Sequence, residues 1–102
     1  MENIMSPREQ AQQLILAELE SCPEYWTAPY GILEGMYTMK NGGKIRTITF
    51  GVARYLDAEI QIWSPKKIVI TGQGGLAYKV EGTYTSVEET IAVLRDAAHK
   101  KQ

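Results

Sequence analysis

The chain has 102 residues, of which 44% are hydrophobic and 23% are charged, and it contains one cysteine. This size and composition suit one domain over residues 1–102, and they exclude a disordered chain or a disulfide-stapled secreted one. With no basic leader and no apolar run of the roughly 18–20 residues that span a bilayer, we expect a cytoplasmic protein whose residues 1–5 are flexible.

The net charge of −1 hides an uneven distribution of charged side chains. Residues 1–39 carry six acidic side chains and one basic, whereas residues 40–80 carry seven basic and two acidic. If residues 40–80 form a sheet, that sheet is locally cationic. Such polarity steers an anionic partner toward one surface without identifying the partner.

The first predicted element is a helix over residues 7–21. Ser6 supplies an N-cap hydroxyl, Pro7 suits the first helical position, and Glu9 completes a capping box. Pro23 ends the run. The apolar stripe of this helix consists of Ala11, Ile15, Leu19 and Cys22, with Leu14 and Leu16 at its margins.

The stretch from Pro23 to Gly31 is predicted to be a loop because it contains two prolines. It also carries Tyr25, Trp26 and Tyr30. Tyrosine and tryptophan are enriched at protein interfaces, so these rings are candidates for contacting a partner. The alternative is that Trp26 is buried and closes the core.

A β-hairpin is predicted from Ile32–Lys40 and Lys44–Val52, because Asn41-Gly42-Gly43 tolerates the positive φ of a tight turn. A two-residue turn at Gly42-Gly43 would set Tyr37 opposite Ile48 and unite the apolar positions on one face. On this register the other face of the hairpin would carry Ile32, Glu34, Met36, Thr38, Lys40, Ile45, Thr47 and Thr49.

Three further strands are predicted over Ala58–Trp63, Lys67–Thr71 and Leu76–Glu81. The turn around Ser64-Pro65-Lys66 joins the first two of them. Sequential strands with short turns pair antiparallel, so the sequence predicts a five-stranded antiparallel β-meander.

A C-terminal helix is predicted to begin after two overlapping capping boxes, Thr85 with Glu88 and Ser86 with Glu89. The fold class is therefore α+β, in the order α-β-β-β-β-β-α. Each helix has one apolar face and so does the sheet, so both helices are expected on one side of it, leaving the other side open. The apolar stripe of the second helix consists of Val87, Ile91, Leu94 and Ala98.

No motif indicates catalysis, a cofactor or a metal, so we expect a protein that is not an enzyme. Cys22 has no evident base, and His99, the only histidine, is predicted to lie exposed at a helix end. The glycines from Gly72 to Gly75 resemble a dinucleotide-binding turn, but no helix is predicted directly after them. Asp57 and Glu59 are expected to be ordinary exposed carboxylates of a strand.

The preferred interpretation is a non-catalytic protein-binding module: a small regulator, adaptor or inhibitor of a larger protein or nucleoprotein. Its size and polarity fit virus- or plasmid-encoded inhibitors of host machinery. The alternative is a single-stranded nucleic-acid-binding protein that uses the basic sheet and its aromatic residues, and a homodimer is left open. The candidate partner-binding residues are Tyr25, Trp26, Tyr30, Lys44, Arg46, Lys66 and Lys67.

Overall fold

The computed structural model describes residues 6–23, 25–26, 32–52, 56–72 and 80–99. Along the chain, one helix precedes the five strands and one follows them, in the order that the sequence predicts. The elements are α1 (Pro7–Glu20), β1 (Leu33–Thr38), β2 (Lys44–Val52), β3 (Leu56–Ser64), β4 (Lys67–Gly72), β5 (Gly82–Tyr84) and α2 (Val87–His99). The expected flexibility of residues 1–5 concerns a segment outside these ranges.

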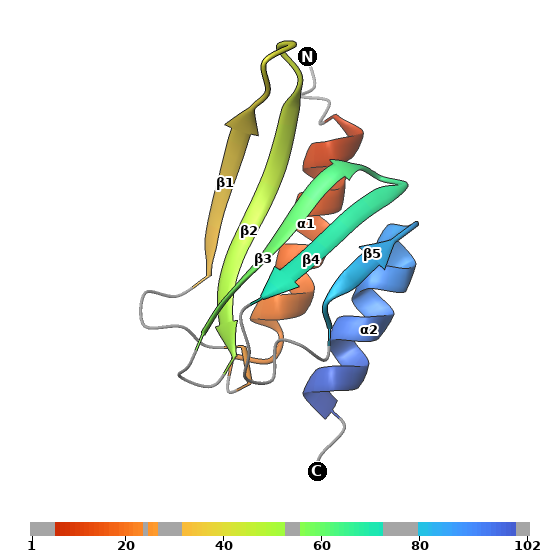
Figure 1. Ribbon diagram of the computed structural model, residues 1–102. Coiled ribbons are helices and arrows are strands. Elements are labelled where there is room, and N and C mark those ends of the chain that lie inside the picture. Colours follow the sequence, from red (N-terminus) through yellow and green to blue (C-terminus); the bar gives the residue numbers. More distant parts are fainter. Residues whose placement is uncertain (1–5, 24, 27–31, 53–55, 73–79, 100–102) are drawn as a thin grey trace, which may run out of the picture.

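The five strands form one sheet in the order β1-β2-β3-β4-β5, and each neighbouring pair is antiparallel. This confirms the predicted meander and the α+β class. Figure 1 views the sheet with the strands in front of α1, and with α2 beside it, behind β5. The helices therefore cover one side, and the other side carries no described helix.

The core lies between the helices and one face of β2, β3 and β4. Every second residue of these strands turns toward the helices, as strand geometry requires. The facing residues are almost fully buried: Ile48, Phe50, Ala58, Ile60, Ile62, Ile68 and Ile70. From α1, Ile15 and Leu19 complete this layer, as the helical stripe predicts, and Leu94 does so from α2.

The start of α1 follows the predicted capping chemistry, and at α2 the hydrogen bonds are those of Ser86 with Glu89, with Glu89 rather than Glu88 bonded to Thr85. The Ser6 hydroxyl accepts from the Glu9 backbone N–H at 3.1 Å, while the Glu9 carboxylate accepts from the Ser6 N–H at 2.9 Å. At α2, the Ser86 hydroxyl accepts from the Glu89 N–H at 3.0 Å, and the Glu89 carboxylate accepts from the Thr85 N–H at 2.9 Å. These bonds satisfy amides that no helical turn can pair.

The fifth strand begins later than predicted. The strand pattern points to Leu76–Glu81, but β5 is Gly82–Tyr84, and residues 76–79 lie outside the described ranges. Val80 is instead fully buried, and its carbonyl oxygen accepts from the Tyr84 hydroxyl at 2.6 Å. The Glu81 carboxylate accepts from the Gly72 backbone N–H at 2.9 Å. At Val80 and Glu81, bonds between side chains and the backbone thus take the place of strand pairing.

The register of the first hairpin differs from the predicted one by three residues. Tyr37 pairs with Ile45 rather than with Ile48. The turn is not a two-residue Gly42-Gly43 turn. It is a three-residue loop closed by a Met39 N–H to Gly43 oxygen bond of 2.7 Å, with Gly42 at φ +89°. This is the type I turn with a glycine bulge that hairpins of this length adopt.

The register difference changes which residues share a face, because successive side chains of a strand alternate. Ile45, Thr47 and Thr49 lie on the side away from the helices, as predicted. Glu34, Met36 and Thr38 of β1 pair with Ile48, Arg46 and Lys44 of β2, whose side chains face the helices. These three β1 side chains therefore lie on the helix side and not on the open side. Their predicted place on the open face is therefore wrong.

Candidate functional site

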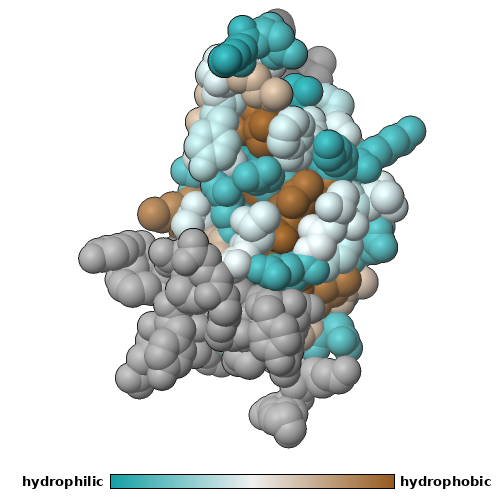
Figure 2. All heavy atoms as spheres, viewed as in Figure 1, coloured by the Kyte–Doolittle hydropathy of each residue, from teal (hydrophilic) through white to brown (hydrophobic). Residues whose placement is uncertain are grey.

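The side of the sheet that the helices leave uncovered is the strongest candidate for a functional surface; we call it the uncovered face. In Figure 2 its described part is a mixture of hydrophilic and intermediate residues with small, separate hydrophobic areas. By strand alternation and register it contains Leu33, Gly35, Tyr37, Ile45, Thr47, Thr49, Glu59, Gln61, Trp63, Lys67, Val69, Thr71 and Thr83.

A connected row of five side chains crosses this face; we call it the Tyr37–Lys67 row. The Tyr37 hydroxyl donates to Glu59 Oε2 at 2.7 Å, and Gln61 Nε2 donates to Glu59 Oε1 at 3.0 Å. Trp63 Nε1 donates to Gln61 Oε1 at 3.1 Å, and Lys67 Nζ lies 4.6 Å from the centroid of the Trp63 ring. Each member thereby holds the orientation of the next.

The row joins β1 to β3 across the strand between them. Since β2 separates these strands in the sheet, the Tyr37 side chain passes over β2 to reach Glu59. Ile45 and Thr47 of β2 point to the uncovered face, yet they are only 6% and 4% exposed. Because the Tyr37 side chain passes over β2, the row and not these two β2 side chains forms the outer surface here.

The Tyr37–Glu59 contact changes the acidity of the phenol. The hydrogen bond to the Glu59 carboxylate, and its negative charge, raise the pKa of Tyr37 above the ordinary value. Folding therefore favours the protonated phenol. The contribution of this pair to stability is complete below the unfolded pKa of about 10 and is lost as the pH rises through the raised folded pKa.

This contact yields a prediction for Glu59→Gln. Removing the negative charge should lower the pKa of Tyr37 toward its ordinary value, although the amide oxygen can still accept the hydrogen bond. Ring resonances of Tyr37 followed by NMR over alkaline pH would measure the change. Glu34→Gln, which removes another exposed carboxylate without touching Tyr37, serves as the control. An unchanged Tyr37 pKa in Glu59→Gln would show that the two groups do not interact in solution.

The aromatic candidates of the first loop are not part of the uncovered face. Trp26 is 2% exposed and stacks edge-on against Phe50, with ring centroids 5.3 Å apart. Tyr25 is half-buried against Trp26, and burial raises the pKa of its phenol. Tyr30 lies outside the described residues. The structure thus places Trp26 in the core, which agrees with the alternative interpretation of that residue.

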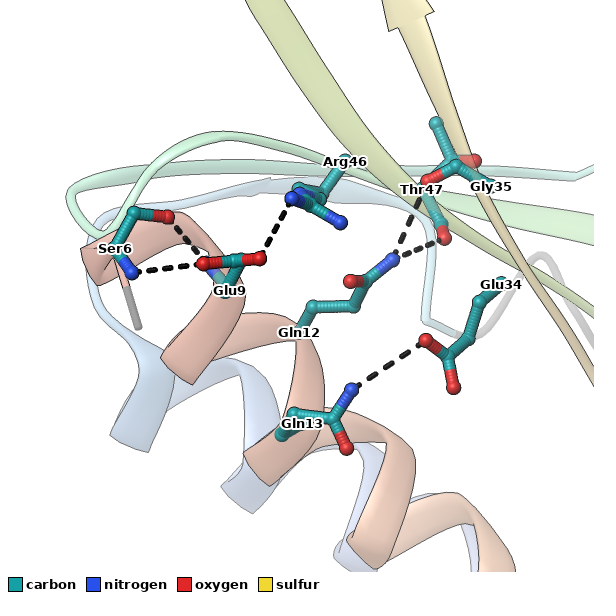
Figure 3. A network of polar contacts seen from close by, with 8 residues as sticks. All are labelled: Ser6, Glu9, Gln12, Gln13, Glu34, Gly35, Arg46 and Thr47. Atoms are coloured by element: carbon teal, nitrogen blue, oxygen red, sulfur yellow. Dashed lines mark hydrogen bonds and ion pairs between the residues drawn. The ribbon is translucent and has the colours of Figure 1, made fainter. Parts of the chain in front are cut away.

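The four basic candidates lie on different parts of the surface. Arg46 turns toward the helix side, where its guanidinium pairs with Glu9 at 2.9 Å, as Figure 3 shows. Lys44 is exposed next to the first hairpin loop. Lys66 is exposed in the β3–β4 turn and lines a hollow of about 380 Å³ between the starts of the two helices. Of the four, Lys67 alone belongs to the uncovered face.

Residues considered for catalysis or metal binding do not converge. Cys22 is buried, and His99 is exposed at the end of α2. Glu59 is occupied by Tyr37 and Gln61, and residues 73–79 of the glycine-rich segment lie outside the described ranges. Among the described residues, no three His, Cys, Asp or Glu side chains come together to hold a metal ion. None of the described helices is long and apolar enough to cross a lipid bilayer.

The row was missed as a candidate site, although part of its signal is present in the sequence. Glu59, Gln61 and Trp63 alternate with the buried Ile60 and Ile62, which is the spacing of one exposed strand face. Taken together, the three describe a partly exposed polar and aromatic strip. The contribution of Tyr37 from β1 to the row depends on the hairpin register, so it could not be predicted from alternation within one strand.

Comparisons of the chain with models of protein families, with curated proteins and with solved structures find no match.

Proposed function

We propose that the chain is a non-catalytic protein-binding module of the cytoplasm, a small regulator, adaptor or inhibitor, that docks a larger protein on its uncovered face. The observation that carries this proposal is the Tyr37–Lys67 row. It places one aromatic ring on the edge strand β1 and another on the central strand β3, with a carboxylate and an amide between them.

The row has the properties of a docking surface for a protein. Tyrosine and tryptophan are enriched among the residues that dominate binding energy. Side chains already held by neighbours lose less conformational entropy on binding, which favours affinity. The mixture of polar and apolar groups is typical of interfaces between proteins that also exist apart. The uncovered face therefore supplies both anchors and hydrogen-bonding groups.

The distribution of charge favours a protein over a single-stranded nucleic acid. A nucleic-acid groove needs several cations along the path of the phosphates, with aromatic platforms beside them. Lys67 and Trp63 provide one such pair, but Arg46 is engaged by Glu9 on the helix side. The Glu59 carboxylate stands in the middle of the row, where it would repel phosphate. Nucleic-acid binding is thus our second choice.

Trp63→Ala tests the proposal, because it removes a ring and two links of the row. Cross-linking followed by affinity capture from cells that produce the protein would identify partners, and each would then be purified and titrated. We expect Trp63→Ala to weaken partner affinity by about tenfold or more, the loss typical of an interface anchor. Leu14→Ala, which shortens an exposed side chain of α1, should bind as the wild type does.

Two results would contradict the proposal. One is equal affinity of wild type and Trp63→Ala for every partner that binds directly, with thermal unfolding showing both proteins folded. The other is a mobility shift of single-stranded oligonucleotides at low salt that weakens in Lys67→Ala and diminishes steeply with added salt. That outcome would favour the nucleic-acid alternative.

A further inference from the structure

Strand β1 is an edge of the sheet without the usual protection against pairing with another strand. It is six residues long, and all six are exposed. Its register with β2 has no bulge, and its sequence contains no proline or lysine, the residues that commonly protect edges. Its single charged side chain is Glu34, whose Oε1 accepts a hydrogen bond from Gln13 Nε2 of α1 at 3.4 Å. The opposite edge, β5, has three residues and lies in front of α2 (Figure 1).

The outward-facing backbone groups of β1 follow from the hairpin loop. The Met39 N–H donates to the Gly43 oxygen, so this pair is a hydrogen-bonded pair of the ladder. Such pairs alternate with non-bonded pairs along antiparallel strands. The N–H and C=O groups of Glu34, Met36 and Thr38 therefore point away from β2, toward the space beyond the edge.

We propose that a second copy of this chain pairs antiparallel with β1, with the two-fold axis at Met36. Met36 of each copy then lies opposite Met36 of the other, and Glu34 lies opposite Thr38 of the second copy. The five strands of each copy join into one continuous sheet, with all four helices on one side. The two uncovered faces become a single surface with a Tyr37 on each side of the seam.

Side-chain shape supports this register. Gly35 lies opposite Tyr37 of the second copy, on the uncovered face. Because Gly35 has no side chain and the Tyr37 ring turns inward over β2 to Glu59, no two side chains collide at this pair on the uncovered face. The two-fold axis repeats this pairing, so the seam is free of side-chain conflict at both Gly35–Tyr37 pairs. The exposed side chain of Met36, 45% accessible, would be covered by its counterpart on the helix side.

Charge also supports this register and orientation. Glu34 near the start of β1 meets the hairpin end of the second copy, where Lys40 follows β1 and Lys44 pairs with Thr38. Opposite charges are thus brought together at both ends of the seam. Placing the axis at Glu34 instead would set two carboxylates directly opposite each other, which is unfavourable. The Met36 axis avoids this.

Sedimentation equilibrium over a series of protein concentrations tests the proposal. Wild type should approach twice the monomer mass as concentration rises, whereas Met36→Lys should remain monomeric because two lysines would meet at the axis. Leu14→Lys makes a similar change at a 55% exposed position of α1 and should dimerise as the wild type does. A wild type that stays monomeric, or a dimer that survives Met36→Lys, would overturn the proposal.

Amide hydrogen exchange locates the seam independently. In the dimer the N–H groups of Glu34, Met36 and Thr38 should exchange slowly, and in Met36→Lys the amides at these positions should exchange fast. The amides of Gly35 and Tyr37 bond to β2 in either state, so their protection in both proteins would show that the hairpin is folded. A doubled mass with fast exchange at the three edge amides would place the dimer on another surface and overturn the proposal.

Discussion

Replacing Trp26 with alanine is expected to lower the free energy of unfolding by about 3–5 kcal/mol. The side chain is 2% exposed, and its ring packs edge-on against Phe50 at 5.3 Å and Tyr25 at 4.6 Å. Truncation would leave a cavity beside the largest core residue of the sheet. A domain of this size has a total stability of about 5–15 kcal/mol, so the loss would be a large part of it.

Trp26→Phe provides the matched control, because it keeps an aromatic ring and removes the indole nitrogen. Among the described residues, the buried Trp26 Nε1 has no hydrogen-bond acceptor. Losing this unpaired donor offsets part of the lost packing, so Trp26→Phe should cost clearly less than Trp26→Ala. Urea unfolding followed by circular dichroism measures both. Equal urea midpoints for wild type and Trp26→Ala would contradict the core role of Trp26 and make it a candidate for contacting a partner again.

The helices and the meander could be predicted because their signals are local. Ser6 and Glu9 cap α1 through contacts only three residues apart in the chain. The alternation that buries Ile60 and Ile62 is likewise contained in one strand. Side-chain periodicity and capping depend on neighbours in sequence, so they are readable without knowing the tertiary contacts.

The hairpin register could not be settled in this way, because Asn41-Gly42-Gly43 suits two different turns. A two-residue turn at the glycines and a three-residue loop with one glycine at positive φ are both common. The structure adopts the second, and the Asn41 Oδ1 supports it by accepting from the Gly43 N–H at 2.8 Å. Either glycine could take the positive φ, so composition alone does not choose between the turns.

The candidate site depends on that choice. With Tyr37 opposite Ile45, the tyrosine lies on the uncovered face and reaches Glu59. With Tyr37 opposite Ile48, it would have faced the helices. The predicted cationic sheet was affected by tertiary structure in a similar way, because Arg46 pairs with Glu9 of α1, which lies 37 positions away in the chain. Long-range contacts thus decide which charges remain available.

Gln12 shows how such a contact also supports the edge of the sheet. It lies on α1, is 1% exposed, and its Nε2 donates to the carbonyl oxygens of Thr47 at 2.9 Å and Gly35 at 3.3 Å (Figure 3). Gln12→Met has a similar length but no donor. We expect it to lower the free energy of unfolding by about 1–3 kcal/mol, the usual cost of leaving buried acceptors with one donor fewer.

Gln13→Met is the control for this substitution, since Gln13 is the neighbouring residue, is exposed and donates at 3.4 Å to the exposed Glu34 carboxylate. It should change stability by no more than about 0.5 kcal/mol. Denaturant unfolding of both variants gives the difference, and hydrogen exchange of the β1 amides shows where it acts. Because Gln12 holds the first two strands against α1, its loss should speed exchange in β1 before it does so in β3. Equal stability of the two variants would mean that the ladder of β1 and β2 positions the first hairpin without help from α1.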